Sequence, residues 1–239
     1  MKVLPEQLRL YAVTDSRHLQ GRTLLETVSA ALDGGATFVQ LRDKDCSPAE
    51  LLAEARALAA LCHTRGVPFV VDDDVEVALA SGADGVHVGQ SDIKGRDIRA
   101  MIGSDKILGI SAGTVEQAVA AEQAGADYIG VGAVFPTSTK KDAKPMEVEQ
   151  LRRISQSVSI PVVAIGGIGA GNGFNGLAGH LAQALTGDQG VTVVLPGNCL
   201  GAAHHKAPHQ NGEQVLRAFF QKFFLQMGKM HGVNPLAHI

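Results

Sequence analysis

The chain has 239 residues, a net charge of −3 and only 4% aromatic residues. Its length is close to the roughly 250 residues of a single (β/α)8 barrel and is sufficient for one sizeable core. The slightly acidic balance and the scarcity of aromatic residues argue against a nucleic-acid surface.

The sequence predicts neither a membrane span nor a secretory signal. No apolar run approaches the ~20 residues that a membrane helix requires, and the first residues lack an apolar signal core. The cysteines, Cys46, Cys62 and Cys199, form neither an even disulfide set nor a metal motif. We therefore expect a reduced, cytoplasmic protein without nucleic-acid or membrane partners.

Short apolar runs alternate with helical patterns along the chain, which favours parallel strands buried on both faces. The clear strand candidates are Arg9–Val13, Thr37–Leu41, Pro68–Val71, Gly85–Val88, Ile107–Ile110, Tyr128–Val131 and Pro161–Ile165. The expected helices are Leu24–Leu32, one from a capping box at Ser47 to Arg65, Val75–Ala80, Ile93–Ile102, one from a second capping box at Thr114, and Glu147–Ser157. Such regular alternation leaves little room for a second domain.

A repeated signature supports the same architecture. A glycine that can end a helix, at Gly34, Gly82 and Gly125, is each time followed by a short apolar strand. Successive copies are separated by about one helix, one strand and two loops. We predict an α/β fold, a (β/α)8 TIM barrel forming a single domain over residues 1–239, with an atypical C-terminal βα unit.

Polar residues follow the strands where a parallel barrel carries its catalysis. After the second strand, Gln40 offers an amide, and Arg42 and Lys44 offer two cations. Arginine can grip phosphate oxygens bidentately, whereas lysine acts as a point charge. The alternative is that both are surface charges paired with Asp43 and Asp45.

Carboxylates follow the third and fourth strands, at Asp72, Asp73, Asp74 and Asp92. Adjacent parallel strands lie about 5 Å apart, so these groups can meet at one ion, and hard oxygen ligands suit Mg²⁺. The alternative is helix capping, which we assign to Asp74. We interpret His87, inside the fourth strand, as a packed core histidine rather than a ligand.

Hydroxyl groups and a lysine form a candidate phosphate loop after the sixth strand. These are Thr137, Ser138, Thr139 and Lys140. After the seventh strand, Gly167 belongs to a glycine pair that lets the backbone approach a ligand, although such a pair can equally be a turn.

Taken together, these positions resemble the thiamine phosphate synthase family, from about Leu10 to Ile168. The motifs are Tyr11-Ala12-Val13-Thr14-Asp15, Val39-Gln40-Leu41-Arg42-Asp43-Lys44, Gly85-Val86-His87-Val88-Gly89-Gln90-Ser91-Asp92, Gly109-Ile110-Ser111-Ala112, Thr137-Ser138-Thr139-Lys140-Lys141-Asp142 and Ala164-Ile165-Gly166-Gly167-Ile168. In that family the enzyme joins 4-amino-2-methyl-5-hydroxymethylpyrimidine diphosphate to 4-methyl-5-(2-hydroxyethyl)thiazole phosphate and releases diphosphate.

The resemblance implies a role for each matching residue. Pyrimidine diphosphate binding falls to Gln40, Arg42, Lys44, Asp72, Ser111 and Lys140, of which Arg42, Lys44, Ser111 and Lys140 are the predicted catalytic residues. Leu41 and Asp43, in the same motif, are also predicted substrate-binding residues. The thiazole phosphate site falls to Thr137, Ser138, Thr139 and Gly167, and the Mg²⁺ ligands are Asp73 and Asp92. Asp72 stands where many family members carry Asn. The sequence leaves the oligomeric state open and is compatible with a homo-oligomer.

The resemblance weakens after Ile168. From Gly169 to Gly212 only Asp188 and Lys206 carry formal charge, and the nearest candidate for an eighth strand is Gly190–Leu195, followed by Pro196. A proline has no N–H for a phosphate. We interpret 169–212 as a divergent segment, disordered or altered by a local reading-frame disturbance, which translation of the other two frames would test.

Three functions are compatible with these patterns. The first is a working thiamine phosphate synthase. The second is a thiazole tautomerase of the same barrel group, which needs an acid/base residue but no diphosphate grip. The third is a non-catalytic relative that binds phosphorylated ligands and has a damaged C-terminal unit. The diphosphate-directed set Arg42, Lys44, Asp73 and Asp92 favours the first.

Overall fold

A computed structural model describes residues 3–8, 10–19, 21–136 and 145–166, together with two strands at 191–195 and 201–205. The predicted phosphate loop, Gly167 and most of the segment 169–212 lie outside the described residues. Within the described part, no helix is long and apolar enough to cross a membrane.

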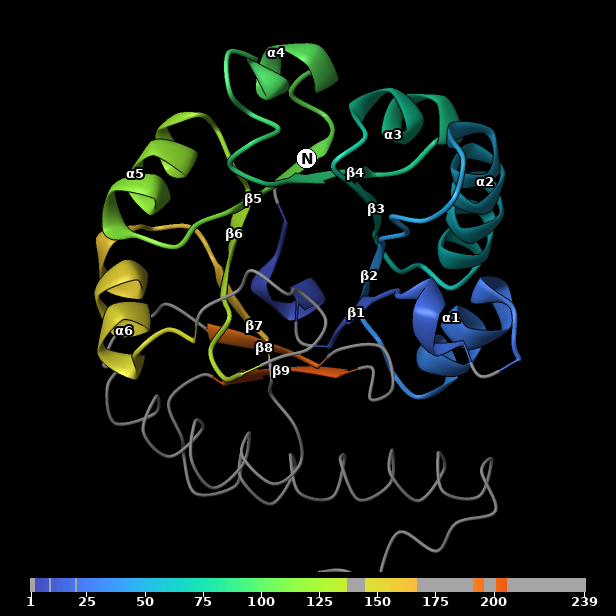
Figure 1. The fold of residues 1–239 in the computed structure, drawn as a ribbon, viewed down its shortest axis with the longest axis horizontal. Coiled ribbons are helices and arrows are strands. Elements are labelled where there is room, and N and C mark those ends of the chain that lie inside the picture. The colour runs from blue at the N-terminus through green and yellow to red at the C-terminus, as the bar shows by residue number, and fades with distance from the viewer. Residues whose placement is uncertain are drawn as a thin grey trace, which may run out of the picture.

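The described strands form one sheet in chain order. They are β1 (Tyr11–Val13), β2 (Phe38–Leu41), β3 (Phe69–Asp72), β4 (Gly85–Val88), β5 (Ile107–Ser111), β6 (Tyr128–Gly132), β7 (Val162–Ile165), β8 (Val191–Leu195) and β9 (Gly201–His205). Neighbours from β1 to β8 pair in parallel, and the sheet curls into a ring (Figure 1). The seven clear strand predictions are confirmed to within two residues at each end.

Helices cover the outside of the ring (Figure 1). The outer α-helices are α1 (Leu24–Asp33), α2 (Pro48–Thr64), α3 (Val75–Ser81), α4 (Ile98–Ile102), α5 (Val115–Gln123) and α6 (Val148–Ser157), and two short 3-10 helices are η1 (Pro5–Leu8) and η2 (Ser16–His18). The prediction of a helix from Ile93 was wrong, because α4 begins only at Ile98. Gly95 has a φ of 73°, which interrupts a helix, and Asp97 then caps α4 by accepting from the Ala100 amide at 3.0 Å.

The predicted helix caps are confirmed with one difference. Ser47 and Glu50 form a reciprocal capping box at α2. At α5 the Thr114 hydroxyl accepts from the Gln117 amide, but Gln117 Oε1 accepts from Gly113 N at 2.7 Å instead of from Thr114 N. The second capping box is therefore only half formed, and its glutamine reaches one residue further back.

The repeated glycine signature also sets the start of the strands. Asp84 accepts from Phe69 N, and Asp127 accepts from Leu108 N, each at 2.8 Å. In the first copy Thr37 Oγ1 accepts from Leu10 N at 2.8 Å. In each copy of the signature, the polar side chain therefore accepts a hydrogen bond from the backbone at the start of the preceding strand, just before the strand of its own copy begins. This contact explains why a polar residue follows the helix-ending glycines.

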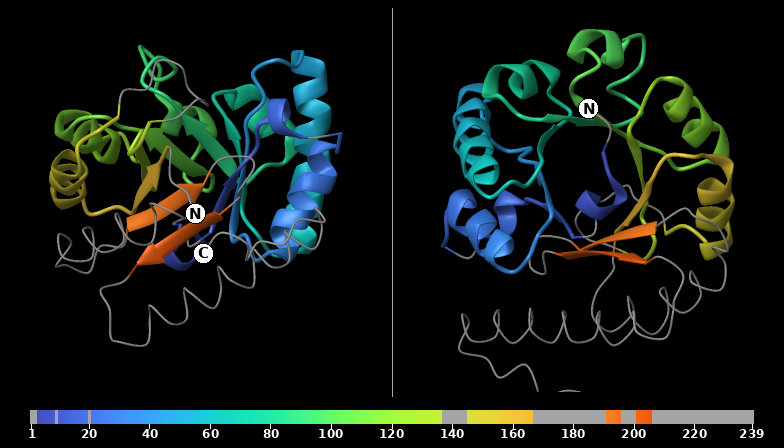
Figure 2. Two further views of the ribbon diagram at one scale, coloured as in Figure 1. Left: turned by 60° about the horizontal axis from the view of Figure 1, so that its bottom comes forward. Right: turned by 180° about the vertical axis from the view of Figure 1, so that it is seen from behind.

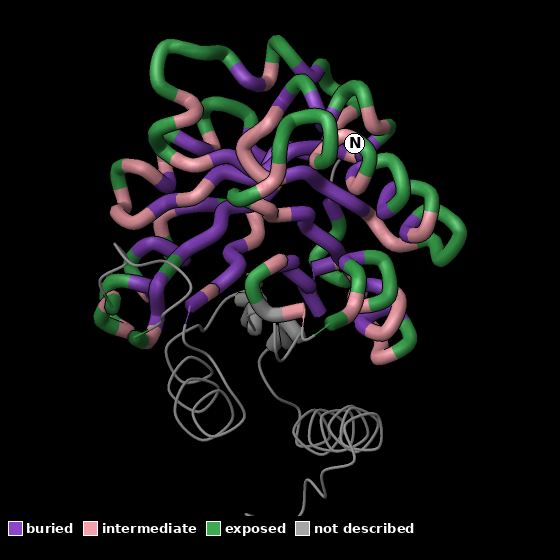
Figure 3. Tube along the Cα trace, turned by 45° about the vertical axis from the view of Figure 1, so that its right-hand side comes forward, coloured by how far each residue is buried: buried purple, intermediate pink, exposed green. Residues whose placement is uncertain are grey.

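Two apolar clusters fill the fold, one between the sheet and the helices and one inside the ring. Strands β1 to β7 are buried along almost their whole length, whereas the outer helices are exposed on one side (Figure 3). Inside the ring, Tyr11, Phe38 and Tyr128 pack with ring centroids 4.5 to 5.9 Å apart. Leu8 of η1 belongs to the same cluster, and η1 lies within the ring of strands (Figures 1 and 2).

The C-terminal part of the sheet departs from simple βα repetition. β8 lies parallel to β7 and coincides with the predicted eighth-strand candidate. It is paired on its other side with β9, antiparallel, from Val191 opposite His205 to Leu195 opposite Gly201. Both strands contact β1, so this pair lies between β7 and β1 (Figure 2). β9 was not predicted.

Candidate active site

The C-terminal ends of β2, β3 and β4 bring the predicted diphosphate and metal residues to one rim. Thr14, just after β1, fixes the first of these ends. Its hydroxyl accepts from Arg42 N at 2.8 Å and donates to Arg42 O at 3.0 Å. Both backbone polar groups of Arg42, its N–H and its C=O, are therefore held by Thr14.

Both cations after β2 reach across to carboxylates after β3. Arg42 Nε lies 3.6 Å and Lys44 Nζ 3.5 Å from Asp72 Oδ2, and Lys44 also pairs with Asp73. Asp43 instead accepts from Ser16 Oγ at 2.9 Å and from the Asp45 amide at 3.0 Å. The alternative in which Arg42 and Lys44 pair with Asp43 and Asp45 is therefore wrong for these side chains.

Asp72 is the buried member of this group, with 12% of its side chain exposed. Burial raises its pKa, and the charges of Lys44 and Arg42 oppose that shift without cancelling it. The same side chain therefore lies beside two cations and in a poorly solvated place. Any ligand that draws the cations away leaves the Asp72 carboxylate uncompensated.

Asp73 has an unusual backbone conformation, with a φ of 62°. The Asp74 amide donates to Asp72 O at 2.8 Å, which closes a three-residue turn around Asp73, and the Asp73 amide donates to His87 O at 2.7 Å. Aspartate tolerates this region better than most residues, and strained backbone of this kind gathers at functional sites. The Asp73 side chain pairs with Lys44, while Asp74 caps α3 through the Val77 backbone amide as predicted.

Asp73 and Asp92 follow the neighbouring strands β3 and β4, and Asp73 is close enough to Asp92 to influence the charge of its carboxyl group. Burial raises the pKa of Asp92, and the nearby Asp73 raises it further. The Gly89 amide donates to Asp92 Oδ2 at 2.9 Å and holds this side chain in place. Two adjacent oxygen donors of like charge fit a divalent cation such as Mg²⁺.

A second set of predicted residues lies deeper, inside the ring. His87 is buried and contacts Tyr128 Oη through Nδ1 and Ser111 Oγ through Nε2, each at 3.0 Å. The prediction that His87 is buried in the fold is confirmed. The prediction missed that this histidine joins Ser111, a predicted catalytic residue, to the barrel interior.

Two glycines make room for this contact. His87, Gly109 and Tyr128 lie opposite one another on β4, β5 and β6. A Cβ at Gly109 would lie 2.4 Å from His87 Nδ1 and 2.3 Å from the Tyr128 ring, and one at Gly130 would lie 3.0 Å from the His87 ring. Glycine inside a strand was therefore the sequence signal for side chains that cross over β5.

The side chains of Gln40 and Leu41 point to opposite sides of β2. Gln40 is buried inside the ring and donates from Nε2 to Tyr11 Oη at 3.0 Å. Leu41 is fully buried in the cluster between sheet and helices, so only its backbone can face a ligand. The other predicted substrate residues, Thr137, Ser138, Thr139, Lys140 and Gly167, lie outside the described residues.

Asp43, Cys46 and Glu54 form another group, whose potential ligand atoms lie within 4.8 Å of one another. Burial raises the pKa of both Glu54 and Cys46, and the charge of Asp43 raises both further. The thiol and the Glu54 carboxyl are thus biased toward their neutral forms.

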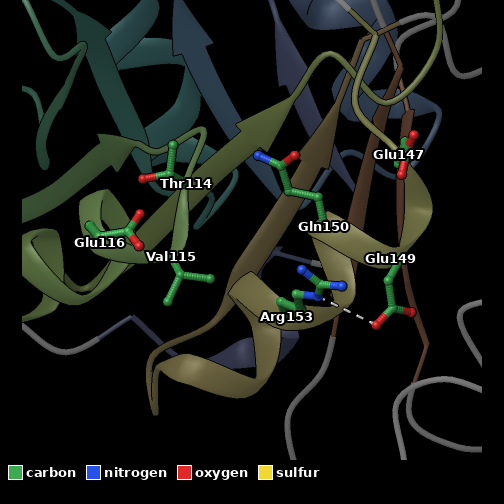
Figure 4. A pocket seen from close by; sticks show the side chains of 7 residues that line it. All are labelled: Thr114, Val115, Glu116, Glu147, Glu149, Gln150 and Arg153. Carbon is green, nitrogen blue, oxygen red and sulfur yellow. Dashed lines mark ion pairs between the residues drawn. The ribbon is translucent and has the colours of Figure 1, made fainter.

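A pocket of about 230 Å³ opens between the N-terminal ends of α5 and α6 (Figure 4). Its lining residues are Thr114, Val115, Glu116, Glu147, Glu149, Gln150 and Arg153. None of them belongs to the predicted site. Arg153 pairs with Glu149 at 3.6 Å, and the other carboxylates would repel a phosphate.

Comparison with known proteins shows the family of the chain. The model of the thiamine monophosphate synthase family matches residues 10–183. The chain belongs to this family. The match extends past Ile168, where the motif resemblance weakens.

Thiamine-phosphate synthases are among the family members most similar to this chain. The one from Ruminiclostridium cellulolyticum is 48% identical over 89% of this chain and 96% of its own length. That of Alkaliphilus oremlandii is 46% identical over 76% of this chain and 90% of its own length. The solved structure of a thiamine phosphate pyrophosphorylase from Pyrococcus furiosus is 34% identical, has a TM-score of 0.71, and aligns over 92% of this chain and 99% of that one. This likeness confirms a fold of the TIM-barrel type.

Proposed function

We propose that this protein is a thiamine phosphate synthase, which joins 4-amino-2-methyl-5-hydroxymethylpyrimidine diphosphate to 4-methyl-5-(2-hydroxyethyl)thiazole phosphate and releases diphosphate. The observation that carries this proposal is the rim itself. Arg42 and Lys44 from β2 meet Asp72 and Asp73 from β3, with Asp92 adjacent. Membership of the thiamine monophosphate synthase family indicates which phosphorylated substrates these charged residues would bind.

The reaction builds negative charge on the departing diphosphate. An electron-rich aminopyrimidine supports a carbocation-like methylene group, which the thiazole nitrogen attacks, so the protein supplies charge stabilisation rather than a nucleophile. Cys62 is buried, with its pKa raised to about 12, and the pKa of Cys46 is also raised. Neither described cysteine is therefore activated as a thiolate.

We propose Mg²⁺ as the cofactor, held by Asp73 and Asp92. When bound, the ion would stabilise negative charge on diphosphate oxygens. The residues of this chain provide the rest of the binding. Arg42 and Lys44 are held near the rim by Asp72 and Asp73, and they would turn toward the phosphate oxygens of the substrate.

The role of the C-terminal segment stays a prediction from sequence. If 169–212 lacks part of the usual donor set for the thiazole phosphate, the KM for that substrate should rise while binding of pyrimidine diphosphate is largely kept. Loss of one or two charge-assisted hydrogen bonds corresponds to weakening on the order of 10- to 10⁴-fold. An intact-mass measurement confirming this sequence, combined with ordinary affinity for thiazole phosphate, would contradict the damage hypothesis.

The test is incubation of the full chain with both substrates and Mg²⁺, followed by detection of thiamine phosphate and diphosphate. We expect both products in equal amounts. A tautomerase would change the thiazole without releasing diphosphate, and a binding protein would retain the substrates unchanged. Either result would overturn the proposal.

A further inference from the structure

A continuous hydrogen-bonded chain crosses the inside of the barrel beneath the rim. Gln40 Nε2 contacts Tyr11 Oη at 3.0 Å, and Tyr11 Oη contacts Tyr128 Oη at 2.6 Å. Tyr128 Oη contacts His87 Nδ1, and His87 Nε2 contacts Ser111 Oγ, each at 3.0 Å. The chain therefore joins two predicted substrate residues, on β2 and β5, that lie far apart in sequence.

One consistent direction runs from Gln40 to Ser111 when each phenol accepts one hydrogen bond and donates its own proton to the next member of the chain. The Nε2 of Gln40 can only donate, so the hydroxyl of Tyr11 accepts there and has its own proton for Tyr128. Tyr128 then accepts from Tyr11 and donates to His87 Nδ1. A histidine that accepts at Nδ1 carries its proton on Nε2 and donates it to Ser111 Oγ.

Burial keeps both phenol protons in place. It raises the pKa of Tyr11 and Tyr128, and the nearby charge of Asp72 raises both further. Two protonated phenols are what the direction of the chain requires.

We infer that Gln40 acts as a positioning residue whose amide orients this chain, so that Ser111 accepts from His87 and keeps its own hydroxyl proton for an acceptor atom of the pyrimidine diphosphate. Among the described residues, the Ser111 hydroxyl has His87 as its hydrogen-bond contact. The inference rests on the proposed function for the identity of the ligand. The direction of the chain does not depend on it.

Direct measurement of the His87 tautomer tests the direction. The full chain, labelled with ¹⁵N-histidine, is studied by NMR, and the His87 signals are identified as those lost in His87→Gln. We expect the form protonated on Nε2 alone. His63 on α2, which is exposed and contacts Asp84, is an internal reference in the same spectrum. A ring protonated on Nδ1, or on both nitrogens, overturns the inference.

Replacement of the Gln40 amide by a group that only accepts hydrogen bonds tests whether Gln40 sets the direction of the hydrogen-bonded chain. A carboxylate can only accept hydrogen bonds, so in Gln40→Glu the Tyr11 hydroxyl should donate to the new carboxylate. Each following hydrogen bond should then reverse its direction, which places the His87 proton on Nδ1. If this buried carboxylate prevents folding, Tyr11→Phe replaces it, since that variant keeps the ring but removes the link, and the Nδ1-protonated form should become populated. An unchanged tautomer in a folded variant overturns the role of Gln40.

Kinetics connect the chain to the ligand. Ser111→Ala should lower kcat/KM on the order of 10- to 100-fold, as expected for one hydrogen bond to a charged group. Tyr11→Phe should lower kcat/KM when Ser111 is present, and it should have little further effect in a protein that already carries Ser111→Ala. Losses that simply add would overturn the coupling. If the protein proves not to be a synthase, the tautomer measurement still decides the direction, so the two failures are distinguishable.

Discussion

The charged rim and the neutral hydrogen-bonded chain beneath it differ in solvent exposure and in the mobility of their polar groups. On the rim, Lys44 leaves 46% of its side chain exposed and can exchange a carboxylate for a ligand. In the interior, Tyr11 and Tyr128 are almost fully buried, and each polar atom has a defined partner. Mobile charges suit a leaving group that gains charge, whereas fixed neutral dipoles suit the orientation of a single hydroxyl.

The largest effect should come from the rim carboxylates. Asp73→Asn and Asp92→Asn should each lower kcat/KM by roughly 10² or more, because the charge stabilisation of a metal ion amounts to several kcal/mol. Asparagine also tolerates the positive φ of Asp73, so a loss would reflect the missing charge. Steady-state rates across a Mg²⁺ titration provide the measurement.

Asp74→Asn is the matched control for these variants. Its side chain caps α3, and asparagine is an equally good cap, so activity should change little. Full activity of Asp73→Asn and Asp92→Asn without added metal would show that the rim carboxylates hold no catalytic ion.

The cations should have the next largest effect. Arg42→Ala and Lys140→Ala should each reduce kcat as well as raise KM, on the order of 10- to 100-fold in kcat/KM, if these groups bind the transition state more strongly than the substrate. Arg42→Lys should not restore the full rate, since a bidentate fork becomes a point charge. Arg65→Lys, on an exposed pair with Asp33, is the control. A kinetically normal Arg42→Lys would mean that geometry at this position is unimportant.

The interior should respond through stability before catalysis. Gly109→Ala places a methyl group 2.3 Å from the Tyr128 ring, and overpacking of this kind costs about 1–3 kcal/mol. We expect Tm to fall by roughly 2 to 12 °C, measured by thermal unfolding. Gly113→Ala is the control, because its methyl group would meet only Gln117 Oε1 at 3.4 Å. Equal Tm values for the two variants would show that the interior has room to adjust.

The smallest effect should appear at Asp72, where the two regions meet. Because burial raises its pKa in the folded state, its favourable contribution is complete below the unfolded pKa and is lost as pH rises through the folded pKa. Asp72→Asn should therefore raise Tm near neutral pH, on the order of 2 °C for about 1 kcal/mol, and the gain should vanish in acid. A lower Tm at neutral pH would show that the ion pairs with Arg42 and Lys44 outweigh the burial.

The sequence by itself determined the parallel order of the barrel and the rim. Strands buried on both faces read as apolar runs, helix-ending glycines recur once per unit, and charged groups stand directly after the strands, so their convergence follows from the chain alone. The late start of α4 and the antiparallel β9 were decided by local turns and by pairing that apolar periodicity does not encode.

Only the tertiary structure decided the interior chain. Its five members come from separate strands; they are Gln40, Tyr11, Tyr128, His87 and Ser111. Their contacts depend on strand register and on the space that Gly109 and Gly130 leave open. A histidine inside a strand reads as a core residue whether it is a packing residue or a proton donor. The difference lies in which atoms face its two nitrogens, and those atoms belong to other strands.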